Sequence, residues 1–154
     1  MSVPARLEEL LDTFALFSDP ADRSNLLISF ADRFKEVPSA VAQRPFDRSH
    51  QVPQCESDAY VWAVPQSDGT LRLHFAVENP SGISAKALAA ILDQTLSGLT
   101  PREISQVSPD IVERIFRQNL SMGKGMGLMS MVMAVKTLAQ RAERLARPDG
   151  TSEG

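Results

Sequence analysis

The stretch AYVWAVPQSDGTLRLHFAVE, residues 59–78, decides the fold of this chain. It opens on β-branched and aromatic side chains, which favour strands. The residues that follow, QSDG at 66–69, have the composition of a tight turn. From Thr70 to Glu78 apolar and polar residues alternate, so one face of this strand is expected to be buried and the other to face water. We therefore predict an antiparallel hairpin, with a short third strand just before Cys55.

Helical patterns lie on both sides of the hairpin. Upstream, apolar residues recur at the spacing of one helical face over residues 4–17. Asp19 followed by Pro20 is typical of the start of a second helix, which we expect to end before Pro38. Downstream, helices are predicted over 84–96, from 101 after a capping box, over 108–116 and over 128–146.

This order of elements predicts a single α+β domain over residues 1–146. Helices are expected to cover a small antiparallel sheet of about three strands. The tail at 147–154 has nothing to bury and is expected to be disordered.

Composition excludes several classes of protein. The chain has 154 residues, of which 43% are hydrophobic and 23% charged, as in ordinary globular domains. Its net charge of −3 lacks the basic footprint of a nucleic-acid binder. The longest apolar stretch, residues 126–135, is too short to cross a membrane, and the N-terminal segment lacks the apolar core of a secretory signal. We expect a cytoplasmic protein that binds neither nucleic acid nor membrane.

The single cysteine, Cys55, is the candidate for chemistry. One cysteine and two histidines exclude a disulfide framework and leave little material for a metal site, so none is predicted. Cys55 follows a polar loop that contains prolines, and loops often carry function, although a buried structural thiol is the alternative. Glu56 and Asp58 disfavour a thiolate, so autonomous acid–base catalysis would need a base such as His50. Attack on a sulfur–sulfur bond demands less of the thiol.

Residues 52–61, VPQCESDAYV, resemble the Val-Pro-Gly-Cys-x-Ser-Gln-Val-Tyr/Trp segment of SufE-like sulfur acceptors. Three further blocks resemble the same family in the same order, at 19–38, 86–104 and 120–128, so the resemblance covers about residues 7–142. Three of the departures from the family pattern concern the cysteine segment and the loop at 121–127. Gln54 replaces the glycine before the cysteine, Asp58 replaces a glutamine, and Lys124 replaces an arginine.

The resemblance implies a sulfurtransferase-type accessory protein. Cys55 would accept persulfide sulfur from a pyridoxal-phosphate cysteine desulfurase, stimulate that enzyme, and pass the sulfur to an iron–sulfur cluster assembly scaffold. The chain itself would need no cofactor. Lys124, from the family's placement of its loop, and His50, from its nearness in sequence, are the candidates to contact the persulfide or the partner.

Two alternative functions remain open at this point. The first is a desulfurase-binding adaptor that keeps the fold but has lost efficient sulfur transfer. The second is an independent cysteine enzyme in which His50 activates Cys55.

The stretch SMGKGMG, residues 121–127, is expected to form a flexible loop because glycine has low helix propensity. An anion-binding loop and a partner-docking loop are the alternatives. The methionines in and after this stretch either fill the core or form an adaptable docking surface.

Overall fold

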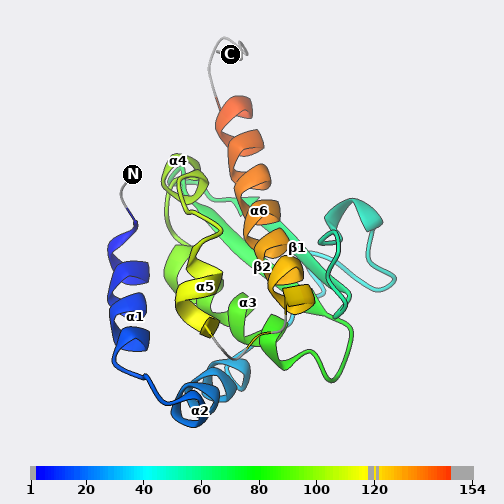
Figure 1. Cartoon of the computed structure of the whole chain (residues 1–154). Helices are drawn as coiled ribbons and strands as arrows, with labels where there is room; N and C mark the ends of the chain where they lie inside the picture. The colour runs from blue at the N-terminus through cyan, green and yellow to red at the C-terminus, as the bar shows by residue number, and fades with distance from the viewer. Residues whose placement is uncertain (1–2, 118–119, 121, 147–154) are drawn as a thin grey trace.

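The computed structural model describes residues 3–117, 120 and 122–146. The tail at 147–154, predicted to be disordered, lies outside these residues. The elements, in chain order, are α1 (Ala5–Ala15), α2 (Pro20–Ala31), the 3-10 turn η1 (Arg48–His50), β1 (Ala59–Pro65), β2 (Leu71–Val77), α3 (Ile83–Leu96), α4 (Pro101–Ser105), α5 (Ile111–Phe116) and α6 (Met122–Leu145). The predicted α+β class is confirmed, and Figure 1 shows the helices gathered around one hairpin.

The hairpin forms where the sequence predicts it. β1 and β2 pair antiparallel, with Tyr60 opposite Ala76 and Trp62 opposite His74. The described part of the sheet has two strands, and the third strand predicted before Cys55 is reduced to a single bridge between Gln51 and Tyr60. Pairing ends there because the chain turns away from β1 at Gln54, where the backbone is left-handed.

The two faces of the hairpin are covered differently. The odd-numbered side chains of β2 point to the main core, where α3 packs against β2 and α6 against β1. On the opposite face, the loop between α2 and η1 covers the sheet, and the Phe46 ring meets the Trp62 ring edge-on at 5.1 Å. Helices therefore cover one face, and a loop with its own small apolar cluster covers the other.

Arg23 ties three helices together at the far end of the core. It lies on α2, and its side chain is only 2% exposed. Its guanidinium donates hydrogen bonds to the carbonyls of Phe14 (2.5 Å) and Phe17 (2.7 Å), at the end of α1, and to those of Arg114 (3.2 Å) and Ile115 (2.8 Å), in α5. Burial lowers the pKa of Arg23, and the charge of Arg117 lowers it further.

The last helix is longer than predicted. It begins at Met122 rather than at residue 128, so most of the stretch expected to be a flexible loop is helical. Leu128 and Met131 are buried in the core and hold this part of the helix in place. Tertiary packing thus overrides the low helix propensity of the glycines.

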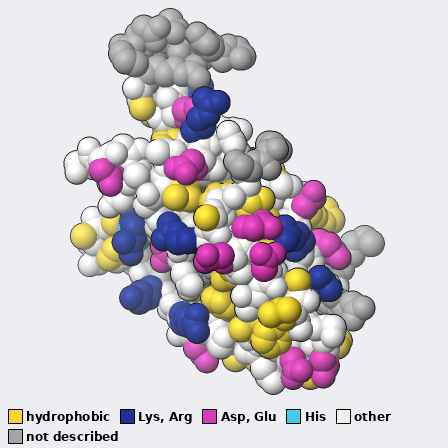
Figure 2. Space-filling view, turned by 90° about the vertical axis from the view of Figure 1, so that its left-hand side faces the viewer, with side chains coloured by type: hydrophobic (Ala, Val, Ile, Leu, Met, Phe, Trp, Pro, Cys, Tyr) yellow, Lys and Arg dark blue, Asp and Glu magenta, His cyan; other side chains and the backbone are white. Residues whose placement is uncertain are grey.

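The distribution of charged side chains on the surface agrees with the small net charge of −3. On the face shown in Figure 2, acidic and basic side chains are interspersed and form no continuous basic stripe. In the described part of the chain, no helix combines the length and the apolar character needed to span a membrane.

Candidate functional site

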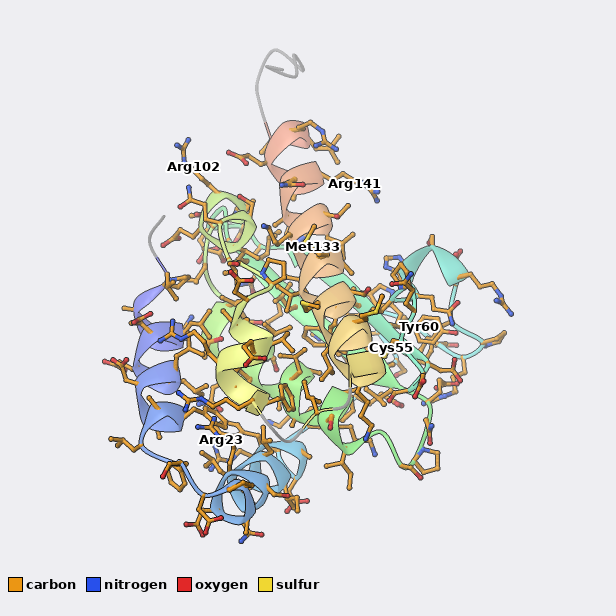
Figure 3. The ribbon with its side chains drawn as sticks, in the orientation of Figure 1. Arg23, Cys55, Tyr60, Arg102, Met133 and Arg141 are labelled. Atoms are coloured by element: carbon orange, nitrogen blue, oxygen red, sulfur yellow. The ribbon has the colours of Figure 1, made fainter. Side chains whose placement is uncertain are left out.

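Cys55 lies in a closed loop between η1 and β1 (Figure 3). The Val52 N–H donates to the Ala59 carbonyl (2.8 Å) at the base of the loop, and the Asp58 N–H donates to the Cys55 carbonyl (3.2 Å) within it. The thiol residue is half-buried. The loop therefore holds Cys55 in a tight turn without sealing it inside the protein.

Two residues of this loop have left-handed backbone. The φ angles are +60° at Gln54 and +51° at Asp58. Aspartate tolerates this conformation because its short side chain bonds to nearby backbone, whereas glutamine does so less readily. Gln54 stands where the resembled family has glycine, and the positive φ gives the physical reason for a glycine there.

Replacing Gln54 by glycine is expected to leave the protein as stable as before or to stabilise it by up to about 1 kcal/mol, because the left-handed cost disappears. The matched control is Gln51→Gly, at an ordinary φ of −72°. There the added chain entropy is expected to destabilise by about 0.5–1 kcal/mol. Urea unfolding of both variants measures the difference. Equal destabilisation by the two substitutions would contradict the assignment of strain to Gln54.

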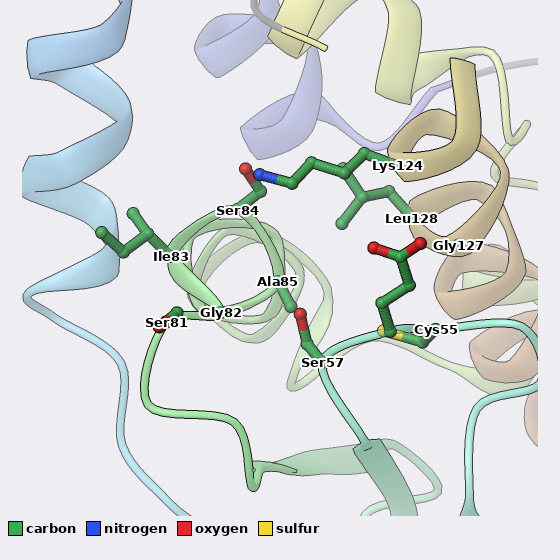
Figure 4. A pocket seen from close by; sticks show the side chains of 11 residues that line it. Cys55, Ser57, Ser81, Gly82, Ile83, Ser84, Ala85, Lys124, Gly127 and Leu128 are labelled. Atoms are coloured by element: carbon green, nitrogen blue, oxygen red, sulfur yellow. The ribbon is translucent and has the colours of Figure 1, made fainter. Parts of the chain in front are cut away.

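A small cavity of about 40 Å³ lies beside Cys55 (Figure 4). Three parts of the chain form its wall: the Cys55 loop, the start of α3 and the start of α6. The lining residues are Cys55, Glu56, Ser57, Ser81, Gly82, Ile83, Ser84, Ala85, Lys124, Gly127 and Leu128.

The cavity is far smaller than a substrate pocket. Sites for small organic ligands usually enclose about 300–1,000 Å³. One water molecule needs about 10–15 Å³ of such space, so 40 Å³ admits only a few atoms. The space next to Cys55 suits the addition of a single atom to the thiol and not the binding of an amino-acid-sized molecule.

Positive charge faces this cavity from two sides. The first N–H groups of a helix have no intrahelical acceptor, and the N-terminal end of the helix dipole is positive. The first residues of α3, 83–85, line the cavity. From α6, the Lys124 side chain extends toward Ser84 (Figure 4). Glu56 also lines the cavity and opposes this charge in part. The helix end and Lys124 together favour a bound anion.

His50 belongs to a different part of the surface. Its Nδ1 lies 2.9 Å from the Val61 carbonyl oxygen, and its ring stacks on Trp62 with centroids 5.2 Å apart. It lines a separate cavity together with Met133. Of the three residues predicted for the site, the structure brings Cys55 and Lys124 to one cavity and places His50 outside its wall.

Sequence reasoning missed two parts of the site. Residues 81–85, at the start of α3, face the cavity from a distant part of the chain. Gly127 packs against the Cys55 loop, although the sequence suggested that it belonged to a flexible loop. The available signal was a glycine next to a strongly periodic helical pattern, which often marks close packing.

The fold and the site define the class as an α+β protein with a half-buried thiol on a tight loop, beside a small cavity near the start of a helix. Comparisons with known proteins agree. The family model described as "SufE: Fe-S metabolism associated domain" matches residues 8–139. The chain therefore belongs to the SufE family, and this places it in iron–sulfur metabolism.

Individual relatives are distant. The chain is 24% identical to "SufE-like protein 1, chloroplastic/mitochondrial" of Arabidopsis thaliana over 97% of its own length, and it spans only 39% of that plant protein. It is also 24% identical to an uncharacterized SufE-like protein of Synechocystis, over 90% of this chain and 82% of that one. The solution structure of a hypothetical protein from Thermus thermophilus has the same fold, with a TM-score of 0.72, 24% identity, and coverage of 92% of this chain and 98% of that one.

Proposed function

We propose that this protein accepts sulfur from the persulfide of a cysteine desulfurase onto Cys55, stimulates that enzyme, and passes the sulfur to an iron–sulfur cluster assembly scaffold. The observation that carries this proposal is the half-buried Cys55 thiol beside a cavity of about 40 Å³. Membership of a family associated with Fe–S metabolism supports it. The cytoplasm, as the place where the protein works, is part of the proposal.

The chemical step is a thiol–persulfide exchange. The Cys55 thiolate attacks the terminal sulfur of the partner's persulfide, a new sulfur–sulfur bond forms at Cys55, and the partner's inner sulfur leaves as a thiolate. One bond between sulfur atoms replaces another, so no external oxidant or reductant is consumed. In a second exchange of the same kind, the thiolate of an acceptor attacks the outer sulfur on Cys55, and Cys55 leaves as a thiolate.

Lys124 and the start of α3 supply the electrostatics of this step. Both line the cavity into which the added sulfur fits. A positive charge on Lys124 and the N–H groups of α3 favour the anionic sulfur before and after transfer. Lys124 is therefore proposed as the residue that contacts the persulfide.

The test is sulfur loading followed by intact mass spectrometry. The protein is incubated with a cysteine desulfurase from the same source and with cysteine, and a gain of one sulfur atom is expected. Protein alkylated at Cys55 beforehand is the control and should gain none. Binding to the desulfurase without any gain of sulfur would overturn the acceptor role and favour the adaptor.

Replacing Lys124 by glutamine is expected to slow sulfur loading about tenfold, because one favourable charge interaction of an anion is lost. Lys124→Arg keeps the charge and is expected to load at close to the rate of the unmodified protein. The measurement is the initial rate of the mass gain at fixed desulfurase concentration. Equal rates for Lys124→Gln and Lys124→Arg would remove the lysine charge from the mechanism.

A further inference from the structure

Gly127 is in direct contact with the Cys55 loop. It lies in α6, and a Cβ built on it would lie 2.9 Å from the Gln54 carbonyl oxygen and 3.3 Å from the Cys55 Cα. The first distance is shorter than real Cβ atoms show, and the atom involved is backbone, which cannot turn aside as a flexible side chain would. No larger residue fits at Gly127 unless the Cys55 loop or α6 moves.

Gly82 makes the corresponding contact from the other side. It is the residue just before α3, and a Cβ there would lie 2.9 Å from Cβ and Oγ of Ser57 and 2.9 Å from Cγ1 of Val77. Its φ of −79° is one that any residue adopts, so space is the reason for glycine here. Figure 4 shows Gly82 just before α3 and Gly127 on α6, on either side of the segment that carries Ser57 and Cys55.

A third glycine provides the contrast. Gly125 is on the same helix as Gly127, and a Cβ there would meet only Leu120 Cδ1, at 3.9 Å, which is ordinary van der Waals contact. Glycine inside a helix is costly in general. Among the described residues, none approaches Gly125 so closely that only glycine would fit. At Gly127, in contrast, the missing side chain permits the close approach of the Cys55 loop.

The loop is the element that would move. α6 is fixed by Leu128, Val132 and Val135, which are at most 3% exposed. The Cys55 loop is held at its base by the bond from the Val52 N–H to the Ala59 carbonyl, and at its far side by bonds from the Glu78 and Asn79 N–H groups to the Asp58 and Ser57 carbonyls (3.1 Å each). The part between these bonds, which contains Gln54 with its left-handed backbone and Cys55, is the part free to shift. A side chain at Gly127 is therefore expected to push Cys55 away from α6 and to open the cavity next to Lys124.

We propose that Gly82 and Gly127, together called the glycine clamp, are positioning residues that seat the Cys55 thiol against its cavity and thereby restrict which molecules reach it. The clamp acts through the loop and touches no reacting atom. Its consequence for sulfur transfer rests on the proposed function, whereas its effect on access to the thiol does not.

The experiment measures alkylation of Cys55, the single cysteine of the chain, by two reagents of different size. Iodoacetamide is the small reagent, and a maleimide attached to a polyethylene glycol chain is the bulky one. In the folded protein the bulky reagent is expected to react much more slowly, relative to the small one, than it does with a free thiol. In Gly127→Ala the ratio of bulky to small rates is expected to rise at least about fivefold, because the loop opens locally. In Gly125→Ala, the matched control, the ratio stays within about twofold.

Two further variants separate positioning from loss of stability. Gly82→Ala presses on the same loop from α3 and should raise the ratio in the same direction, which keeps the test available if Gly127→Ala does not fold. Arg23→Lys weakens the protein far from the loop with the clamp intact, and should leave the ratio unchanged while the protein is folded. An unchanged ratio in both folded clamp variants would overturn the proposal, as would an equal rise in Gly125→Ala or Arg23→Lys.

Sulfur loading of the same variants distinguishes the two proposals. A raised alkylation ratio together with slower loading supports the clamp and the acceptor function. If the unmodified protein itself gains no sulfur while the ratio still rises in Gly127→Ala, the acceptor function is overturned and the clamp is supported.

Discussion

Cys55→Ser is expected to lose all sulfur loading and all stimulation of the cysteine desulfurase. Serine has nearly the shape of cysteine, but its hydroxyl is a far weaker nucleophile toward a sulfur–sulfur bond than a thiolate. Cys55 is the single cysteine of the chain, so no other thiol can take over. Intact mass spectrometry measures the sulfur gained, and the rate of alanine formation from cysteine measures the desulfurase.

The two measurements on Cys55→Ser separate the competing functions. The acceptor mechanism requires that both fall together, because removal of sulfur from the desulfurase is what accelerates it. Stimulation that survives without loading would favour the adaptor. The thermal unfolding midpoint is the control and should change little, because a half-buried residue is replaced by one of similar volume.

Arg23→Met is expected to destabilise the protein by about 3–5 kcal/mol, the usual cost of breaking a buried charged hydrogen-bond network. Methionine keeps the length of the side chain but donates no hydrogen bond. The carbonyls of Phe14, Phe17 and Ile115 then lose the guanidinium as a donor. Carbonyls at the C-terminal end of a helix have no intrahelical partner and carry the negative end of the helix dipole, so a cation there is favourable.

Urea unfolding and the thermal midpoint measure this effect, and the midpoint is expected to fall by about 10 °C. The matched control is Arg33→Met, because Arg33 is exposed on the turn after α2 and lies 4.8 Å from the Phe30 ring centroid. Its loss is expected to cost less than about 1 kcal/mol. Figure 3 places Arg23 far from Cys55 across the molecule, so folded Arg23→Met should still load sulfur at low temperature. Similar destabilisation by the two arginine variants would contradict the role assigned to Arg23.

The elements with strong local signals agree between sequence and structure. The hairpin occupies the alternating stretch, with a turn at Gly69, whose φ is +86°. The predicted capping box at Thr100 forms with Glu103, and Asp19 accepts the Ala21 N–H at the start of α2. These features depend on contacts within a few residues, so the local sequence is enough to define them.

The start of α6 and the third strand were predicted less well. Glycines at 123, 125 and 127 weaken a helix when judged alone, yet the helix forms because its next turns are buried. A short third strand was predicted just before Cys55, but the chain turns at Gln54 and the described residues there make one bridge, between Gln51 and Tyr60. Both outcomes depend on neighbours that lie far away in the sequence.

By itself the sequence determined the α+β class, the hairpin, the family and the candidacy of Cys55, because periodicity, turn chemistry and an ordered set of motifs are local properties. Only the tertiary structure decided what surrounds the thiol. It brought the start of α3, Lys124 and two glycines to Cys55 and left His50 on another cavity, although His50 is the nearest of them in sequence. The physical reason is that close packing acts between surfaces that the fold brings together, and its fit to within a few tenths of an ångström is not encoded in any short stretch of the chain.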